Sequence, residues 1–248
     1  MSANHYSEDF YADQQDGSAR SAEIVVPLVL SAFRVGSVVD VGCGVGGWLK
    51  EFARNGVEDH LGLDGDHVPR KALKIGPEHF IPTDLTKFGG LSRRFDLALS
   101  LEVAEHLPES CAERFVAALT RLAPVVLFSA AIPGQGGTDH INEQWQDYWW
   151  EKFQARGYVC LDFIRPQVFS DEGIEWWYRQ NLLVFCEPGM RPPHIPAVSS
   201  PYDIVRIHPG LLEARAAMRP PTGREALNAI LRNVGHVGQA VKRRVGAV

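Results

Sequence analysis

The stretch Val38-Val-Asp-Val-Gly-Cys-Gly-Val-Gly-Gly-Trp-Leu-Lys-Glu51 decides how the rest of the chain folds. It starts with a β-branched run, residues 38–41, of the kind found in strands that are buried on both faces. Glycines follow at positions 42, 44, 46 and 47, and apolar residues at helical spacing come after them. The order of strand, glycine turn and helix predicts a βα unit whose turn lets a ligand approach the backbone closely.

Asp40 narrows the class of ligand that this turn can bind. Gly42, Gly44 and Gly47 match the G-x-G-x-x-G spacing, which dinucleotide-binding proteins also use. A carboxylate two positions before the first glycine attracts an ammonium group and repels a pyrophosphate. We therefore expect a ligand with an amino-acid moiety, and an NAD(P)-dependent oxidoreductase is the more distant alternative.

The segment Asp40-Val-Gly-Cys-Gly44 resembles the first motif of class I S-adenosylmethionine (SAM)-dependent methyltransferases. The resemblance covers roughly residues 20–186 and implies a transferase that uses SAM as its cofactor. It implies that Asp64 binds the ribose hydroxyls and that Asp84 meets the adenine amino group. The expected cofactor-binding residues are Asp40, Gly42, Cys43, Gly44, Gly46, Trp48, Asp64, Gly65, Thr83, Asp84, Leu85, Leu101 and Glu102.

The alternation of strand and helix patterns predicts an α/β fold. We expect a doubly wound, seven-stranded Rossmann-like methyltransferase sheet with helices on both faces, an antiparallel pair at its end, and a C-terminal helical extension. The expected strands are 38–41, 60–64, 80–85, 95–101, 124–130, 158–164 and 182–185. The expected helices are 18–33, 108–122 and 141–153, the last with Asn142 as its N-cap.

Four segments are expected along the chain. Residues 1–17 form an N-terminal flap or leader, and residues 18–186 form the class I methyltransferase domain. Residues 187–221 are proline-rich and predict an extended linker. Residues 222–248 predict a basic amphipathic helix, which suits a homodimer contact or a peripheral contact with an anionic membrane.

Composition excludes several classes of protein. A chain of 248 residues suits one domain with appendages, and a formal net charge of −5 does not favour general nucleic-acid binding. The four cysteines lack C-x-x-C spacing, which predicts reduced thiols and a cytoplasmic location. The longest apolar run, residues 24–33, is too short to span a bilayer.

The cluster Glu102-x-x-Glu105-His106 permits two interpretations. In the first, the segment lines the methionine end of SAM and the histidine packs. In the second, Glu102, Glu105, His106 and the later His140 hold a divalent metal ion, Mg or Mn. That set resembles the metal ligands of small-RNA 2′-O-methyltransferases, and the implied acceptor is a vicinal diol, such as an RNA end or a catechol.

His140 has a second possible role as a general base. The segment from Asp139 to Trp145 resembles methyltransferases encoded with glycan and sugar biosynthesis genes, in which the histidine deprotonates a hydroxyl. We favour this metal-free base, with the flanking Asp139 and Glu143 able to orient the imidazole. The expected reaction is transfer to a hydroxyl of a small molecule, most simply a sugar or glycan. The candidate catalytic residues are His140, His106 and Glu105, and the candidate substrate-binding residues are Tyr11, Asn142, Glu143 and Trp145, with Trp145 expected to be exposed.

Overall fold

The computed structural model describes residues 8–218, with side chains for residues 17–216. The chain divides into two units, residues 1–211 and 212–248, and the fold described below is that of the first. The expected C-terminal helix at 222–248 and the side chain of Tyr11 lie outside the described part. Within the described part, no helix combines the length and the hydrophobicity that crossing a bilayer requires.

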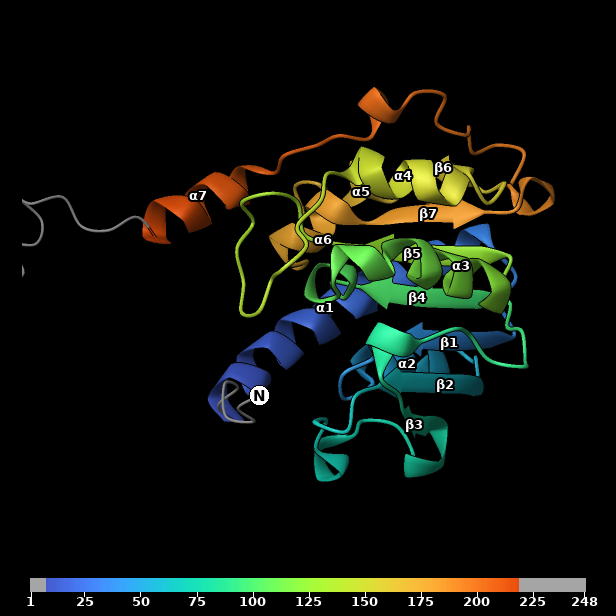
Figure 1. Cartoon of the computed structure of the whole chain (residues 1–248), viewed down its shortest axis with the longest axis vertical. Coiled ribbons are helices and arrows are strands. Elements are labelled where there is room, and N and C mark those ends of the chain that lie inside the picture. The colour runs from blue at the N-terminus through green and yellow to red at the C-terminus, as the bar shows by residue number, and fades with distance from the viewer. Residues whose placement is uncertain (1–7, 219–248) are drawn as a thin grey trace, which may run out of the picture. The chain divides into compact units, whose positions relative to one another are not determined.

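The first unit is built on a seven-stranded sheet in the order β3-β2-β1-β4-β5-β7-β6. Figure 1 shows these strands stacked edge to edge from β3 at the bottom to β6 at the top. The strands are β1 (Ser37–Val41), β2 (Asp59–Asp64), β3 (Phe80–Pro82), β4 (Leu97–Leu101), β5 (Val125–Ser129), β6 (Val159–Leu161) and β7 (Leu183–Cys186). The expected seven-stranded α/β sheet is confirmed.

The strand order reverses at β1, which pairs in parallel with β2 on one side and with β4 on the other. β5 continues the parallel set, and β7 then runs antiparallel between β5 and β6, as expected for the end of the sheet. In open α/β sheets, ligands bind at the carboxyl ends of the strands where the order reverses. The carboxyl ends of β1 and β4 are therefore the place to look for a site.

Helices cover both faces of the sheet. On one face, α1 (Glu8–Ala32), α2 (Gly47–Arg54), α5 (Arg165–Val168) and α6 (Trp176–Asn181) contribute to one hydrophobic core. On the other face, α3 (Ala112–Leu122) and α4 (Gln146–Gln154) contribute to a second core. Both cores draw on the β-branched and leucine-rich strands, since residues on alternate sides of each strand face opposite layers.

Two helices begin later than the sequence predicts. α3 starts at Ala112, because residues 109–111 form a separate 3₁₀ turn after Pro108. α4 starts at Gln146 with Trp145 at the N-cap position, so Asn142 is not its cap. The amide of Asn142 instead lies within hydrogen-bond distance of the Ala104 carbonyl.

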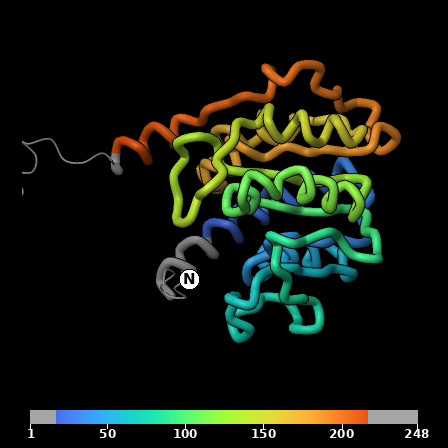
Figure 2. Tube along the Cα trace, in the orientation of Figure 1, coloured from blue at the N-terminus to red at the C-terminus, as the bar shows by residue number. Residues whose placement is uncertain are grey.

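Both ends of the unit differ from the expected boundaries. The backbone of residues 8–17 forms the first turns of α1, which continues through Pro27. Residues 188–208 are not a free linker: Ile195 and Ile204 are buried, and the Val198 N–H donates to the Cys160 carbonyl at 2.8 Å. An unexpected helix, α7 (Pro209–Met218), follows. The Cα trace in Figure 2 shows residues 188–208 running along the β6–β7 side of the sheet.

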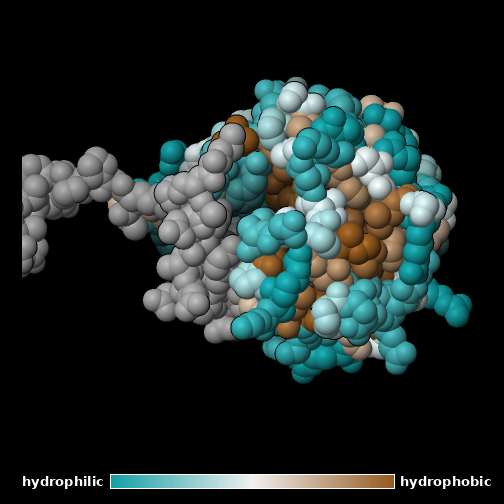
Figure 3. Space-filling view, turned by 60° about the horizontal axis from the view of Figure 1, so that its bottom comes forward, coloured by the Kyte–Doolittle hydropathy of each residue, from teal (hydrophilic) through white to brown (hydrophobic). Residues whose placement is uncertain are grey.

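The β3 edge of the sheet is short. Figure 3, which brings this side forward, shows hydrophobic side chains between hydrophilic ones. Ile81 in β3 is 42% exposed, and Pro82 ends the strand. A short edge strand that ends on proline is a poor template for pairing with another chain.

Candidate functional site at the carboxyl ends of β1 and β4

The glycine turn after β1 brings the backbone close to the turn after β4. Gly42 has φ of +91°, and a Cβ there would lie 2.3 Å from the Val103 side chain. Gly46 has φ of +83°, and Ile75 packs against it. Only glycine combines this left-handed backbone with such close packing. Both positions therefore require glycine for the shape of the turn.

Two carboxylates at this turn have different surroundings. Asp64, at the end of β2, accepts backbone N–H groups from Gly44 at 2.7 Å and Gly65 at 2.6 Å. Asp40 is 2% exposed, and its carboxylate accepts no hydrogen bond within the described part of the chain. Burial, and secondarily the charge of Asp64, raises the pKa of Asp40 to about 7. A cationic ligand would therefore stabilise the charged form of Asp40.

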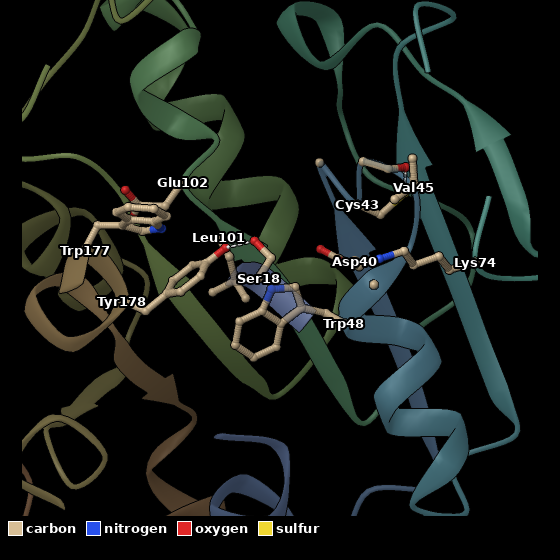
Figure 4. A pocket seen from close by; sticks show the side chains of 13 residues that line it. Ser18, Asp40, Cys43, Val45, Trp48, Lys74, Leu101, Glu102, Trp177 and Tyr178 are labelled. Carbon is tan, nitrogen blue, oxygen red and sulfur yellow. Dashed lines mark hydrogen bonds between the residues drawn. The ribbon is translucent and has the colours of Figure 1, made fainter. Parts of the chain in front are cut away.

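A cavity of about 180 Å³ opens beside Asp40. Figure 4 shows it between the glycine turn and α2 on one side and Glu102 with α6 on the other. Its walls come from both turns and from three helices: Ser18, Asp40, Gly42, Cys43, Gly44, Val45, Gly47, Trp48, Lys74, Leu101, Glu102, Trp177 and Tyr178.

The cavity fits the methionine end of SAM. A Cβ at Gly44 or Gly47 would meet no atom within 4 Å, so the backbone there faces open space that a ligand can occupy. Asp40 suits the ammonium group, and the buried indole N–H of Trp48 has no partner among the described residues. Unpaired buried polar groups are rare in native structures, because their desolvation is not compensated.

The structure assembles part of the expected cofactor-binding set. Seven of its members line the cavity: Asp40, Gly42, Cys43, Gly44, Trp48, Leu101 and Glu102. Gly46, Asp64 and Gly65 support the turn without lining the cavity. Thr83, Asp84 and Leu85 do not line it either. Asp84 instead caps the 3₁₀ turn at 85–87, where its carboxylate accepts the Thr86 N–H at 3.0 Å and pairs with Lys87.

Side-chain amides hold Glu102 in the wall of the cavity. Glu102 has φ of +54°, which is unusual for a residue with a side chain. Its carboxylate accepts from Gln135 Nε2 at 2.7 Å and from Asn181 Nδ2 at 3.1 Å. Burial raises the pKa of Glu102, and the two amides oppose that rise. These two hydrogen bonds connect Glu102, which follows β4, to the loop after β5 and to α6.

Beside Glu102 lies a cluster of one carboxylate and two imidazoles. Glu105, His106 and His140 each offer a ligand atom, and these atoms lie within 4.8 Å of one another. The His106 and His140 rings meet edge to face with centroids 4.8 Å apart. Burial, followed by the charge of Glu102, raises the pKa of Glu105 well above its ordinary value. Burial also lowers the pKa of His106, which therefore favours the neutral imidazole.

The loop after β5 brings His140 to this cluster. Glu143 accepts N–H groups from Gly134 at 2.6 Å and Gly136 at 2.7 Å, and its Oε1 lies 3.0 Å from His140 Nδ1. Backbone N–H groups of residues 141 and 142 donate to the Glu105 carbonyl, which fixes the loop on the β4 exit. Of the two flanking carboxylates expected to orient His140, Glu143 is the one whose side chain contacts its ring.

The expected substrate residues of this loop fall into two groups. Trp145 is 38% exposed, as predicted, and Ile141 is 64% exposed. Asn142 is 4% exposed, with its side chain between the Ala104 carbonyl and Gln144. Trp145 therefore faces solvent, whereas Asn142 holds the loop.

Several site residues were not anticipated from the sequence. Ser18, Lys74, Trp177 and Tyr178 line the cavity, and Ser18 Oγ lies 2.9 Å from Tyr178 Oη. The Trp-Trp-Tyr run at 176–178 stands out in the sequence, yet nothing in it points to β4. Lys74 has no distinguishing neighbours at all, so only the fold identifies it.

The sequence of the chain matches a known protein family. Residues 14–181 match the model of a family described as "Methyltransferase domain". No protein of curated function matches the chain.

Solved structures of methyltransferases are similar to this fold. The methyltransferase domain of bacterial CtHen1-C is 22% identical, with a TM-score of 0.51 over 68% of this chain and 97% of that one. Magnesium protoporphyrin IX methyltransferase from Synechocystis PCC 6803, solved with bound SAM, is 18% identical, with a TM-score of 0.50 over 74% and 86%. A putative O-methyltransferase from Nostoc punctiforme PCC 73102 is 15% identical, with a TM-score of 0.53 over 72% and 59%.

The family match covers more than half of the chain, and the cavity fits the methionine end of the expected cofactor. The chain therefore belongs to the methyltransferase domain family and is a class I SAM-dependent methyltransferase.

Proposed function

We propose that this enzyme transfers a methyl group to a hydroxyl of a small molecule, most simply a sugar or glycan. The observation that carries the proposal is the oriented imidazole of His140, held by Glu143 beside the Glu102 wall of the cofactor cavity. An oriented imidazole is the usual group that takes a proton from a reacting hydroxyl near neutral pH.

The bound cofactor supplies an electrophilic methyl group on a sulfonium. The protein has to hold the acceptor oxygen in line with that methyl and remove its proton. His140 contacts Glu143 through Nδ1, and its Nε2 makes no hydrogen bond with the described residues. His140 Nε2 accepts the hydroxyl proton, and the Glu143 carboxylate stabilises the imidazolium that forms.

The surface beside His140 supports a substrate that is polar at the reacting hydroxyl and flat on one face. Trp145 and Ile141 are exposed on the same loop. An exposed indole suits the apolar face of a sugar ring or an aromatic ring. This supports a sugar or another ring-bearing alcohol as the acceptor.

One observation favours a metal-assisted form of the same reaction. Both oxygens of Glu105 are buried and have no hydrogen-bond partner among the described residues. A buried carboxylate beside two imidazoles fits a divalent cation, and Glu143 on His140 matches the carboxylate that often orients a metal-binding histidine. Glu105, His106 and His140 would hold the ion, which would act as a Lewis acid on a vicinal diol. Glu102, the fourth expected ligand, is instead engaged by Gln135 and Asn181.

The test combines an acceptor screen with chelation. The enzyme is incubated with SAM and a panel of sugars, nucleotide sugars, catechols and RNA ends, and mass spectrometry detects the gain of one methyl. Methylation of a sugar hydroxyl that persists in a chelator supports the metal-free base. Methylation that stops in a chelator and returns with Mn or Mg supports the cation-assisted form.

Two variants complete this test. His140→Ala removes activity in either form, whereas His194→Ala, at an exposed position, is the matched control. Methylation confined to nitrogen or carbon acceptors would overturn the proposal.

A further inference from the structure

The segment at residues 204–208, which the sequence places in a linker, is bonded to the interior of the domain. Three buried side chains hold its backbone: Arg165 at the Ile204 carbonyl (2.9 Å), Gln146 at the Arg206 carbonyl (3.0 Å) and Gln180 at the His208 N–H (2.9 Å). Of these three side chains, Gln180 is the one whose contacts continue toward the cofactor cavity.

The contact with His208 fixes the direction of the Gln180 amide. A backbone N–H can only donate, so the Gln180 atom that meets His208 is the oxygen Oε1. Nε2 of Gln180 then points the other way and donates to Gln135 Oε1 and to Asn181 Oδ1, each at 3.1 Å. The side chain of Gln180 is fully buried, and both of its N–H groups are used in this way.

The next two amides carry the same direction to Glu102. Asn181 Nδ2 donates to Gln135 Oε1 at 2.9 Å, and both amides donate to the Glu102 carboxylate. A carboxylate can only accept, so the chain has a donor at one end, His208, and an acceptor at the other. Turning any one amide around would bring two donors or two acceptors together. We call Gln180, Gln135 and Asn181 the amide relay.

Glu102 depends on such contacts for its place in the cavity wall. It lines the cavity on the side away from Asp40 (Figure 4). Its φ of +54° is a left-handed conformation that costs free energy for a residue with a side chain. Hydrogen bonds from the surrounding structure must therefore hold the residue in this conformation.

We propose that Gln180 is a positioning residue for Glu102. It couples residues 204–208 to the wall of the cofactor cavity through the other two amides of the relay. Residues 204–208 thereby belong to the active site, although they do not line the cavity. The proposal concerns the wall of the cofactor cavity and is independent of which acceptor the enzyme methylates.

The test is a double-mutant cycle on SAM affinity, measured by calorimetry without an acceptor. Glu102→Gln places an N–H group where the relay requires an acceptor, so SAM should bind about ten- to a hundredfold more weakly. Gln180→Met should weaken SAM binding by about three- to tenfold in the wild-type protein. In the Glu102→Gln protein it should change SAM binding by less than about twofold, because the relay is already broken there.

Gln146→Met is the matched control. Gln146 is also a buried amide bonded to the 204–208 backbone, and its Oε1 has no hydrogen-bond partner among the described residues. Its effect on SAM affinity should be the same with and without Glu102→Gln. The side-chain NH₂ resonances of Gln135 give a second measurement, since they should shift in Gln180→Met and stay in place in Gln146→Met. Thermal unfolding of each variant checks that the domain is intact.

Gln180→Asn is a second variant for the same cycle. It keeps a buried amide but is one methylene shorter, so it cannot meet both His208 and Gln135. It should lose SAM affinity with the same dependence on Glu102, and it decides the question where Gln180→Met does not fold.

Several results would overturn the relay. These are additive effects of the changes at 180 and 102, coupling of equal size in the Gln146→Met cycle, and wild-type SAM affinity in Glu102→Gln. Unchanged Gln135 resonances in Gln180→Met would overturn it as well. Failure of the wild-type protein to bind SAM would instead overturn the cofactor, and the Gln135 resonances would still test the relay.

Discussion

The turn after β1 and the turn after β4 lie side by side and are built in different ways. In the first, the carboxylate of Asp64 is satisfied by two backbone N–H groups. In the second, Glu102 is held by side-chain amides of Gln135 and Asn181, which lie 33 and 79 positions further along the chain. We call the turn after β1 the cofactor side of the site, and the turn after β4 with its neighbouring His140 loop the acceptor side. The cofactor side is fixed by local backbone geometry, whereas the acceptor side depends on long-range side-chain contacts.

The same contrast holds for the groups left unpaired. On the cofactor side the buried donor of Trp48 has no partner, and on the acceptor side the carboxylate of Glu105 has none among the described residues. The packing of Val103 on Gly42 joins the two turns physically. Each side therefore keeps at least one buried polar group without a protein partner in the described part of the chain.

The largest expected effect is on the acceptor side. His140→Ala should lower the turnover number by about 10²–10⁴-fold, since it removes the oriented base. SAM affinity should stay within about twofold, because His140 does not line the cavity. Steady-state kinetics and calorimetry measure the two quantities. A parallel loss of SAM affinity would show that the two sides are not separable in this way.

Asp64→Ala tests the cofactor side. The variant loses the acceptor for two backbone N–H groups of the glycine turn, so SAM should bind about ten- to a hundredfold more weakly. The melting temperature should also fall, because the turn itself loses support. Asp66→Ala, at an exposed neighbouring position, is the control. Unchanged SAM affinity would show that the turn holds its shape without this carboxylate.

Asp40 predicts a pH dependence of cofactor binding. Its pKa of about 7 in the free cavity means that the carboxyl is largely protonated at pH 5.5, and an ammonium ligand requires the charged form. SAM affinity should rise by up to about tenfold per pH unit between pH 5.5 and 7 and then level off.

Lys74 and Glu102 are the other charged groups that line the cavity, so a variant of Asp40 is needed to assign the pH profile to Asp40. Asp40→Asn should bind SAM weakly and with a flat profile over that range. Calorimetry in two buffers of different ionisation enthalpy should also detect proton release by the wild-type protein below pH 7. A profile that is equally steep in the variant would assign the titration to another group.

The smallest effect is expected at the contact between α1 and α6. Tyr178→Phe removes the hydroxyl that meets Ser18 at 2.9 Å in the cavity wall. We expect SAM to dissociate about two- to fivefold faster, as for the loss of one partly buried neutral hydrogen bond. Stopped-flow displacement measures the rate, and Tyr202→Phe, at a position 83% exposed, is the control. A change above about tenfold would mean that this contact holds α1 over the cavity.

Much of the fold could be predicted from the sequence, because the deciding signals are local. The β-branched run before Gly42 and the acidic ends of β1 and β2 follow from neighbouring residues, and so does the alternation of strands and helices. Those signals led to the seven-stranded sheet, and the resemblance of residues 40–44 to the class I motif led to the cofactor and to seven of the cavity residues. The helix starts at 112 and 146 were missed, since a 3₁₀ turn and a side-chain contact with Ala104 override the propensities there.

Only the tertiary structure decided how the two sides of the site are completed. Lys74 enters the cavity because its backbone is tied to Val45, and Glu102 is clamped because α6 and the β5 exit converge on it. Residues 188–208 carry proline signals that favour an extended chain, yet they pack on the domain through Ile195 and Ile204. Burial and long-range pairing depend on which elements meet in space. The sequence determined the cofactor turn, whose geometry is local, and the fold determined what surrounds it.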